Sequence, residues 1–130
     1  MPTIEINGKN YGFDESQVID FNEGLVGLPE MRQAALIALP DFEPFCWLAS
    51  ITDERNRFVV VDPAELFEDY RPAGDAADVR TLAIVKISSD WRKTTVNLRA
   101  PIFVEPTTRR GVQRVLNDTD YSLTEAIPQD

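Results

Sequence analysis

Short apolar runs separated by turn residues recur along the chain and predict a protein built from strands. Near the N-terminus, Ile4 and Ile6 alternate with polar residues, and Asn7-Gly8 separates them from Tyr11 and Phe13. An Asn-Gly pair between two such runs favours a tight hairpin, because a type I′ turn needs positive φ at both central positions. The sequence therefore predicts an N-terminal β-hairpin.

The later apolar runs follow one another at roughly ten-residue intervals, which is typical of an antiparallel barrel or sandwich. Phe58–Val61 has β-branched residues at consecutive positions, as in a strand buried on both faces. We predict an all-β fold, a small antiparallel β-barrel-like single domain over residues 1–130 with two or three short helices. The other predicted strands are Val18–Phe21, Ala35–Leu39, Phe45–Ile51, Leu82–Ile87, Thr94–Leu98, Ile102–Glu105 and Val112–Leu116.

Asp62-Pro63-Ala64-Glu65 has the pattern of a helix start, with Asp at the N-cap, Pro at the first helical position and Glu at the third. In a short helix that begins there, Leu66, Phe67 and Tyr70 can point inward. We also expect one helical turn at Pro29–Gln33, a flexible connection at Arg71–Val79 and a turn at Arg109–Gly111.

The chain is acidic, with 22 Asp and Glu against 13 Lys and Arg, a net charge of −9 and a sequence pI near 4.4. Such a chain repels phosphate, so we expect no direct binding of nucleic acid and no binding to an anionic membrane. Between Asp41 and Asp78 the net charge is −7, and between Arg92 and Arg114 it is +5. These stretches form either two solvated faces or an acidic face that recruits a basic partner.

The N-terminus has no secretory signal pattern, and no apolar run is long enough to span a bilayer. The single cysteine, Cys46, excludes an internal disulfide, so we expect a cytoplasmic protein. The absence of histidine removes the commonest general base and metal ligand. Gly24 and Gly27 form only a lone GxxG. We expect no enzyme, no metal and no cofactor, with paired carboxylates as the one catalytic option left open.

The chain resembles the flagellar assembly factor FliW family in six segments, which occur in the same order as in the family. They are Phe21–Leu28, Pro44–Ser50, Phe58–Pro63, Leu82–Val85, Thr95–Ile102 and Gly111–Leu116. The resemblance implies a cytoplasmic, chaperone-like regulator with two protein partners, flagellin and the RNA-binding dimer CsrA, which represses flagellin translation. It implies that the protein, once freed from flagellin, captures CsrA so that flagellin mRNA is translated. One departure is Pro72–Arg80, which is shorter than the acidic helical stretch of many relatives.

Partner contacts are expected in the acidic middle of the chain and at one later motif. Phe67 and Tyr70 are either an exposed apolar spot or core residues. Three roles are open for Asn97 and Arg99: they are ordinary surface residues, they form a structural hydrogen bond, or they contact a partner. The predicted partner-binding residues are Asp62, Pro63, Glu65, Phe67, Glu68, Asp69, Tyr70, Asn97 and Arg99.

Two other function classes remain open at this point. One is an all-β small-ligand or carbohydrate binding module, which predicts a pocket with Trp47, Trp91 or Tyr121 exposed. The other is a hydrolase that uses carboxylates. Phe45 and Trp47 are expected to pack in the core, with Cys46 as a small buried residue on the other strand face. We expect a monomer.

Overall fold

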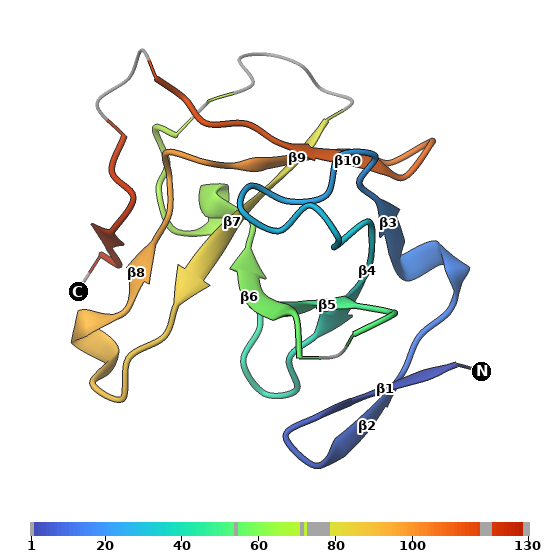
Figure 1. The fold of residues 1–130 in the computed structure, drawn as a ribbon. Coiled ribbons are helices and arrows are strands. Elements are labelled where there is room, and N and C mark those ends of the chain that lie inside the picture. Colours follow the sequence, from blue (N-terminus) through green and yellow to red (C-terminus); the bar gives the residue numbers. More distant parts are fainter. Residues whose placement is uncertain (1, 54, 71, 73–78, 118–120, 129–130) are drawn as a thin grey trace.

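The computed structural model describes residues 2–53, 55–70, 72, 79–117 and 121–128, and short strands joined by turns dominate it (Figure 1). The strands are β1 Thr3–Ile6, β2 Lys9–Gly12, β3 Val18–Asp20, β4 Gln33–Ala38, β5 Cys46–Ser50, β6 Arg57–Val61, β7 Arg80–Lys86, β8 Thr95–Val96, β9 Ile102–Glu105, β10 Arg110–Gln113 and β11 Glu125–Ala126. Three single 3-10 turns accompany them: η1 Glu15–Gln17, η2 Pro63–Glu65 and η3 Trp91–Lys93. The predicted all-β class is confirmed.

Seven of the strands form a closed barrel. Strands β3 to β7 pair in antiparallel succession, β7 also pairs with β9, and β9 pairs with β10. The ring closes through a parallel bridge between Arg110 of β10 and Asp20 of β3. Strands β8 and β11 continue the sheet from β7, outside the ring. Closure removes the free edges that an open sheet of these strands would present.

The barrel interior is filled by side chains. Successive residues of a strand point to opposite faces, so every second residue contributes to the interior. Leu48, Val60 and Leu82 lie there with at most 1% of their surface exposed. The remaining buried members of this interior cluster are Ile19, Phe21, Leu25, Met31, Ala34, Ile102 and Val104.

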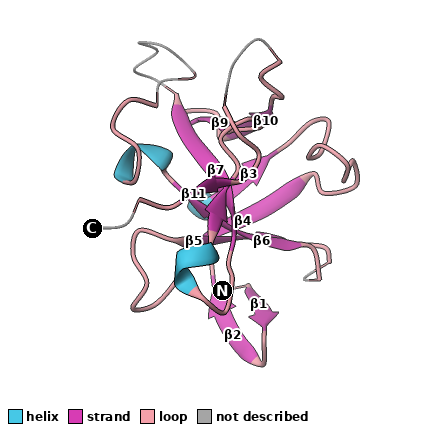
Figure 2. Cartoon of the chain, turned by 90° about the vertical axis from the view of Figure 1, so that its left-hand side faces the viewer, coloured by secondary structure: helices cyan, strands magenta, loops and turns pink. Residues whose placement is uncertain are grey.

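The N-terminal hairpin covers one outer face of the barrel. Asn7 and Gly8 have φ of 53° and 83°, so the predicted positive-φ turn between β1 and β2 is confirmed. Ile4 and Ile6 of the hairpin pack against Ile37 of β4 in a second cluster, which also contains Phe13, Ala35 and Ala49. Figure 2 shows the hairpin below the barrel strands.

A third cluster covers the outer face of β6 and β7. It contains Val59 and Val61 from β6 and Ala83 and Val85 from β7. Residues 62–70, strand β8 with the loop after it, and the C-terminal segment pack over them, through Tyr70, Val96, Leu98 and Ile127. Strand β6 therefore contributes to clusters on both of its faces, which confirms the burial predicted for Phe58–Val61.

Two glycines are required by close packing. Gly24 has a φ of 69°, and a Cβ placed there would lie 2.4 Å from the backbone oxygen of Pro29. A Cβ on Gly111 would lie 2.6 Å from the ring of Phe21 in the barrel interior. Gly111 therefore lets β10 approach β3 where the barrel closes.

Several predicted elements are corrected. Pro29–Gln33 is no helical turn, because Gln33 already pairs with Asp20 as part of β4. The strand predicted at Val112–Leu116 lies at Arg110–Gln113, so only Arg109 of the predicted Arg109–Gly111 turn is a turn residue. The position of β10 along β3 follows from Gly111, because a residue with a Cβ at this place would collide with the ring of Phe21. The predicted connection at Arg71–Val79 lies mostly outside the described residues.

Candidate protein-binding surface

Residues 62–70, here called the acidic segment, leave the end of β6 and fold back over the outer face of β6 and β7. The carboxylate of Asp62 accepts a 3.0 Å hydrogen bond from the backbone N–H of Ala64, and Pro63 is buried at the next position. The predicted helix start is thus confirmed, although the helix is the single 3-10 turn η2. Leu66 and Phe67 then pack against the third cluster.

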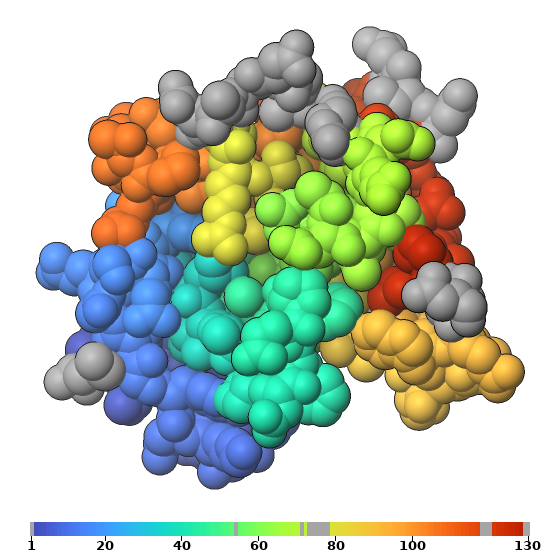
Figure 3. Space-filling model, turned by 180° about the vertical axis from the view of Figure 1, so that it is seen from behind, coloured from blue at the N-terminus to red at the C-terminus, as the bar shows by residue number. Residues whose placement is uncertain are grey.

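The acidic segment exposes its carboxylates and buries its apolar side chains. Glu65, Glu68 and Asp69 are exposed, whereas Phe67 is half-buried. Tyr70 has only 4% of its surface exposed, so the exposed apolar spot considered for it is wrong and it is a core residue. Figure 3 shows the yellow-green residues of this segment on one face of the molecule.

Asn97 and Arg99 are tied to the acidic segment through the residue between them. The hydroxyl of Tyr70 donates a 2.6 Å hydrogen bond to the backbone carbonyl of Leu98. The side chain of Asn97 accepts backbone hydrogen bonds from Arg99 and Ala100, at 3.1 and 3.0 Å. Asn97 therefore has the structural hydrogen-bonding role considered for it, and Arg99 is half-buried beside it. The structure brings the two predicted groups together.

The loop before β5 lies at the same end of the β5–β6 pair as the acidic segment. Cys46 at the start of β5 pairs with Val60 near the end of β6, so residues 41–45 and the start of the acidic segment are neighbours. Phe45 packs in the same cluster as Phe67 and meets Trp91 edge-on, with ring centroids 5.6 Å apart. This end of the β5–β6 pair thus combines carboxylates with aromatic rings.

Sequence analysis missed Phe42 as a candidate contact, and considered Trp91 only for a ligand pocket. Phe42 has 64% of its surface exposed and Trp91 has 47%. The backbone N–H of Phe45 donates to the carbonyl of Phe42 at 2.9 Å, which fixes the turn that presents Phe42. A signal was available, because Phe42 lies between Pro40 and Pro44 in a loop with two acids.

The acid-rich part of the sequence from Asp41 to Asp78, which includes the acidic segment, does not form one continuous face. Asp41 and Glu43 lie in the loop before β5, whereas Asp53 lies in the turn after β5, at the other end of that strand. Hydrogen bonds from Arg55 lower the pKa of Asp53, and the two side chains form an ion pair at 3.0 Å. Asp53 is therefore paired with Arg55, at the opposite end of β5 from the carboxylates of the acidic segment and of the loop before β5.

The residues expected to pack do so. Trp47 is partly buried and packs between the second and third clusters, and Cys46 is half-buried at the edge of the interior cluster. Burial raises the pKa of the Cys46 thiol above its ordinary value, and the nearby charge of Arg80 opposes this in part. The expected opposite placement of Cys46 and Trp47 on β5 is confirmed, because they join different clusters.

Within the described ranges, no group of three or more Cys, Asp and Glu side chains is arranged to hold a metal ion. None of the described helical turns is long and apolar enough to cross a membrane. Four surface cavities are lined by described residues, and neither Trp47, Trp91 nor Tyr121 lines any of these four. The aromatic pocket expected of a carbohydrate binding module therefore has no counterpart in them.

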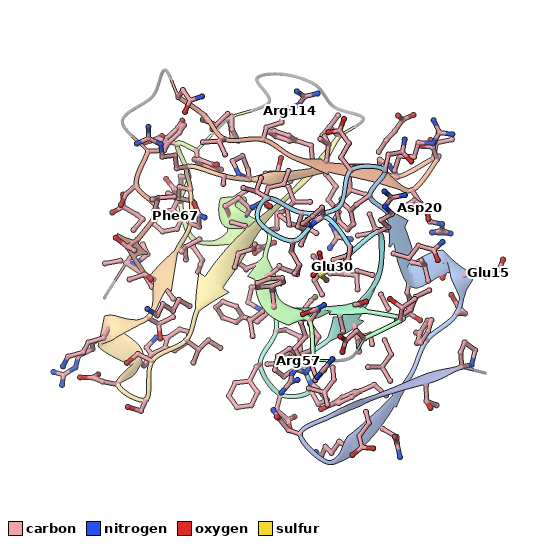
Figure 4. All side chains as sticks on the ribbon, viewed as in Figure 1. Glu15, Asp20, Glu30, Arg57, Phe67 and Arg114 are labelled. Carbon is pink, nitrogen blue, oxygen red and sulfur yellow. The ribbon has the colours of Figure 1, made fainter. Side chains whose placement is uncertain are left out.

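Figure 4 labels one residue of the acidic segment and several charged residues elsewhere on the molecule. Phe67 marks the acidic segment, and Glu15 marks the opposite side of the molecule in this view. Glu15, Glu23 and Glu30 are exposed acids that belong to η1 and to the loop between β3 and β4. They are therefore matched comparison sites for the carboxylates of the acidic segment.

Comparison with known proteins gives one consistent result. The sequence model of the FliW protein family matches residues 6–127. The flagellar assembly factor FliW of Clostridium botulinum (strain Alaska E43 / Type E3) is 30% identical, over 91% of this chain and 92% of that protein. The flagellar assembly factor FliW 2 of Desulfotalea psychrophila is 32% identical, over 98% and 91%. A crystal structure of a flagellar assembly factor FliW superimposes with a TM-score of 0.87 at 25% identity, covering 99% of both chains.

Proposed function

Because the chain belongs to the FliW family of flagellar assembly factors, we propose that it acts in the cytoplasm by binding flagellin and by antagonising the translational repressor CsrA. The observation that carries the proposal is the match of the family model to residues 6–127 of the 130-residue chain. In this proposal the protein is a monomer, residues 1–130 form a single domain, and the protein acts by binding other proteins without catalysis.

The acidic segment is the proposed CsrA contact. Glu65, Glu68 and Asp69 expose their carboxylates. Phe42 is exposed in the neighbouring loop before β5, and Trp91 is an exposed residue whose ring meets Phe45 of that loop. A protein that binds RNA is usually basic around its RNA site. Negative charge therefore favours docking next to that site, and the exposed rings supply apolar contact area for the complex. The other proposed contact residues hold this surface in place or lie at its margin. Asp62, Pro63, Phe67 and Tyr70 hold it in place, and Asn97 and Arg99 lie at its margin.

Repulsion of phosphate is the proposed mechanism of antagonism. A carboxylate near the path of the RNA raises the free energy of RNA binding over about one Debye length, ~8 Å at physiological salt. The protein can therefore weaken RNA binding without occupying the RNA site. If increasing salt leaves the antagonism unchanged while the complex with CsrA stays intact, this electrostatic mechanism is wrong.

Flagellin binding is proposed to use a surface groove for an amphipathic helix rather than strand addition. Among the described strands, barrel closure leaves free edges only on the β1–β2 hairpin and on the short strand β11. These edges offer few backbone groups to an added strand. A helix that is presented by an unassembled subunit instead needs an apolar surface with a polar rim.

The central experiment reverses charge on the acidic segment. Replacing Glu65, Glu68 and Asp69 together by Lys removes three exposed contacts, each worth about 0.5 kcal/mol. The affinity for CsrA is expected to fall roughly tenfold or more, measured by calorimetric titration. The matched control is the triple Lys variant of Glu15, Glu23 and Glu30, which changes the net charge equally and should bind as the parent protein does.

If both triple variants lose affinity to the same extent, the protein uses its net charge and not the acidic segment. If neither variant loses affinity, the contact lies elsewhere. Failure of the parent protein to bind either CsrA or flagellin at micromolar concentration contradicts the proposed function itself.

A further inference from the structure

A cavity of about 280 Å³ opens at one end of the barrel, between η1 and the turn that joins β9 to β10. Its floor is apolar and is formed by interior side chains from four strands, Ile19, Leu36, Leu82 and Val104. The wall over residues 16–19 lies between Glu15 and Asp20, which Figure 4 labels. Val18, Pro106, Ser16 and Gln17 complete the lining together with two arginines.

Arg80 and Arg109 bring positive charge to this apolar cavity. Arg80 is the exposed first residue of β7, and Arg109 is half-buried in the turn before β10. The backbone carbonyl of Arg109 accepts a 2.9 Å hydrogen bond from the backbone N–H of Asp20, and the guanidinium of Arg109 donates to the backbone carbonyl of Ser16. A guanidinium has five N–H donors, so donors remain after this contact. Arg109 is therefore held in place with hydrogen-bonding capacity to spare.

The two guanidinium groups lack carboxylate partners at ion-pair distance within the described part of the chain. The ion pairs found there join Arg55 to Asp53 and Arg92 to Asp90. The charge of Arg109 makes only the smallest contribution to lowering the pKa of Asp14, behind the hydrogen bonds from Ser16. Positive charge at the cavity mouth thus persists in a chain whose net charge is −9.

We propose that this cavity binds a small amphiphilic carboxylate, with its aliphatic body on Ile19, Leu36, Leu82 and Val104 and its carboxylate between Arg80 and Arg109. A neutral apolar ligand would fill the floor but leave the guanidinium groups partly desolvated and unpaired. A purely ionic ligand such as phosphate would leave the apolar floor of the cavity in contact with water. Arginine pairs well with a carboxylate because its planar fork matches the two oxygens.

The volume restricts the size of the ligand. Ligand sites generally occupy about 300–1,000 Å³, so this cavity lies just below the usual range and can take only a small ligand. An unbranched eight-carbon acid, octanoate, is an appropriate probe. The same chemistry occurs at the C-terminus of a polypeptide that ends in an aliphatic residue, and the proposal assigns the site to the free acid. The cavity contains none of residues 62–70, so the proposal does not depend on partner binding there.

The test is titration of the isotopically labelled protein with octanoate, followed by nuclear magnetic resonance. Saturable shift changes are expected at the methyl groups of Leu36 and Leu82. The neutral analogue 1-octanol should bind about tenfold more weakly, since it loses a charge-assisted hydrogen bond, and octylamine should not bind. Octanol binding as tightly as octanoate overturns the role of the arginines. An N-acetylated tripeptide ending in Leu that binds more tightly than octanoate overturns the assignment to a free acid.

Two variants and one control locate the site. Arg80→Gln removes one cation from an exposed position and should weaken octanoate binding at least fivefold, while octanol binding is unchanged. Leu36→Phe narrows the cavity and should weaken both ligands. The control Arg114→Gln removes an exposed arginine outside the cavity and should change neither affinity. Equal affinities in Arg80→Gln and the parent protein, with both folded as judged by their spectra, overturn the proposal.

Discussion

The hydroxyl of Tyr70 donates a 2.6 Å hydrogen bond to the backbone carbonyl of Leu98, and this bond joins the acidic segment to the loop after β8. Both residues are buried in the third cluster. Tyr70 also packs edge-on against Tyr121, with ring centroids 4.6 Å apart. The contact thus links three parts of the chain that are distant in sequence.

Replacing Tyr70 by Phe removes this hydrogen bond and leaves the ring in place. The free energy of unfolding should fall by about 1–2 kcal/mol, because the buried carbonyl of Leu98 loses a partner. Urea unfolding measures this as a lower midpoint with an unchanged slope. Tyr11→Phe, at a half-buried position of β2, is the control and should change stability by less than about 0.5 kcal/mol. Equal effects of the two substitutions would contradict a specific contribution from Tyr70.

Stability should depend on alkaline pH through the same residue. Burial, and to a smaller extent Tyr121, raises the pKa of Tyr70 above its ordinary value. Above about pH 10 the unfolded chain loses a proton that the folded protein keeps, so the folded state becomes less stable as pH rises. Below that pH both states are protonated and the contribution is constant. The stability difference between the parent protein and Tyr70→Phe should therefore narrow as the pH rises from about 10 to about 11, and a constant difference contradicts the shifted pKa.

The closing seam of the barrel should be sensitive to a single methyl group. In Gly111→Ala the new Cβ would lie 2.6 Å from the ring of Phe21 and 2.8 Å from a methyl carbon of Ile19. Overpacking of this kind costs about 1–3 kcal/mol, measured by urea unfolding. Combining it with Phe21→Leu makes room for the methyl group, so the double variant should lose less stability than the sum of the single variants. Strict additivity would show that the two positions do not compete for space.

Asn97 is expected to stabilise the fold without contributing directly to partner affinity. Asn97→Ala removes the acceptor for the backbone N–H groups of Arg99 and Ala100 and should cost about 1 kcal/mol. Asn97→Asp keeps an acceptor at the same place and should recover most of this loss. CsrA affinity, measured on the folded fraction, should be unchanged in both variants. A loss of affinity in the stable Asn97→Asp protein would instead assign the amide to the interface.

Local patterns predicted those parts of the fold whose cause is local. Asn7-Gly8 predicted the hairpin because both residues adopt positive φ. The β-branched run at Phe58–Val61 predicted a strand covered on both faces, and Asp62-Pro63 predicted the turn that follows it. In each case a few adjacent residues determine the backbone conformation.

Features that depend on distant residues could not be predicted in this way. The place of β10 depends on the close approach of Gly111 to Phe21, ninety positions earlier in the chain. The burial of Tyr70 depends on Leu98 and Tyr121, and a short helical pattern could not indicate these partners. The cavity arginines, Arg80 and Arg109, become neighbours only when β7, β9 and β3 enter one barrel.

The anchoring of the acidic segment at both ends has a thermodynamic consequence for recognition. Pro63 and Tyr70 are buried, so the backbone that carries Glu65, Glu68 and Asp69 is already ordered before any partner arrives. A charged loop without such anchors would lose backbone conformational entropy of about 1–2 kcal/mol for each residue that becomes fixed on docking. Here most of that entropy has been given up during folding. A modest number of surface carboxylates can therefore support a selective complex.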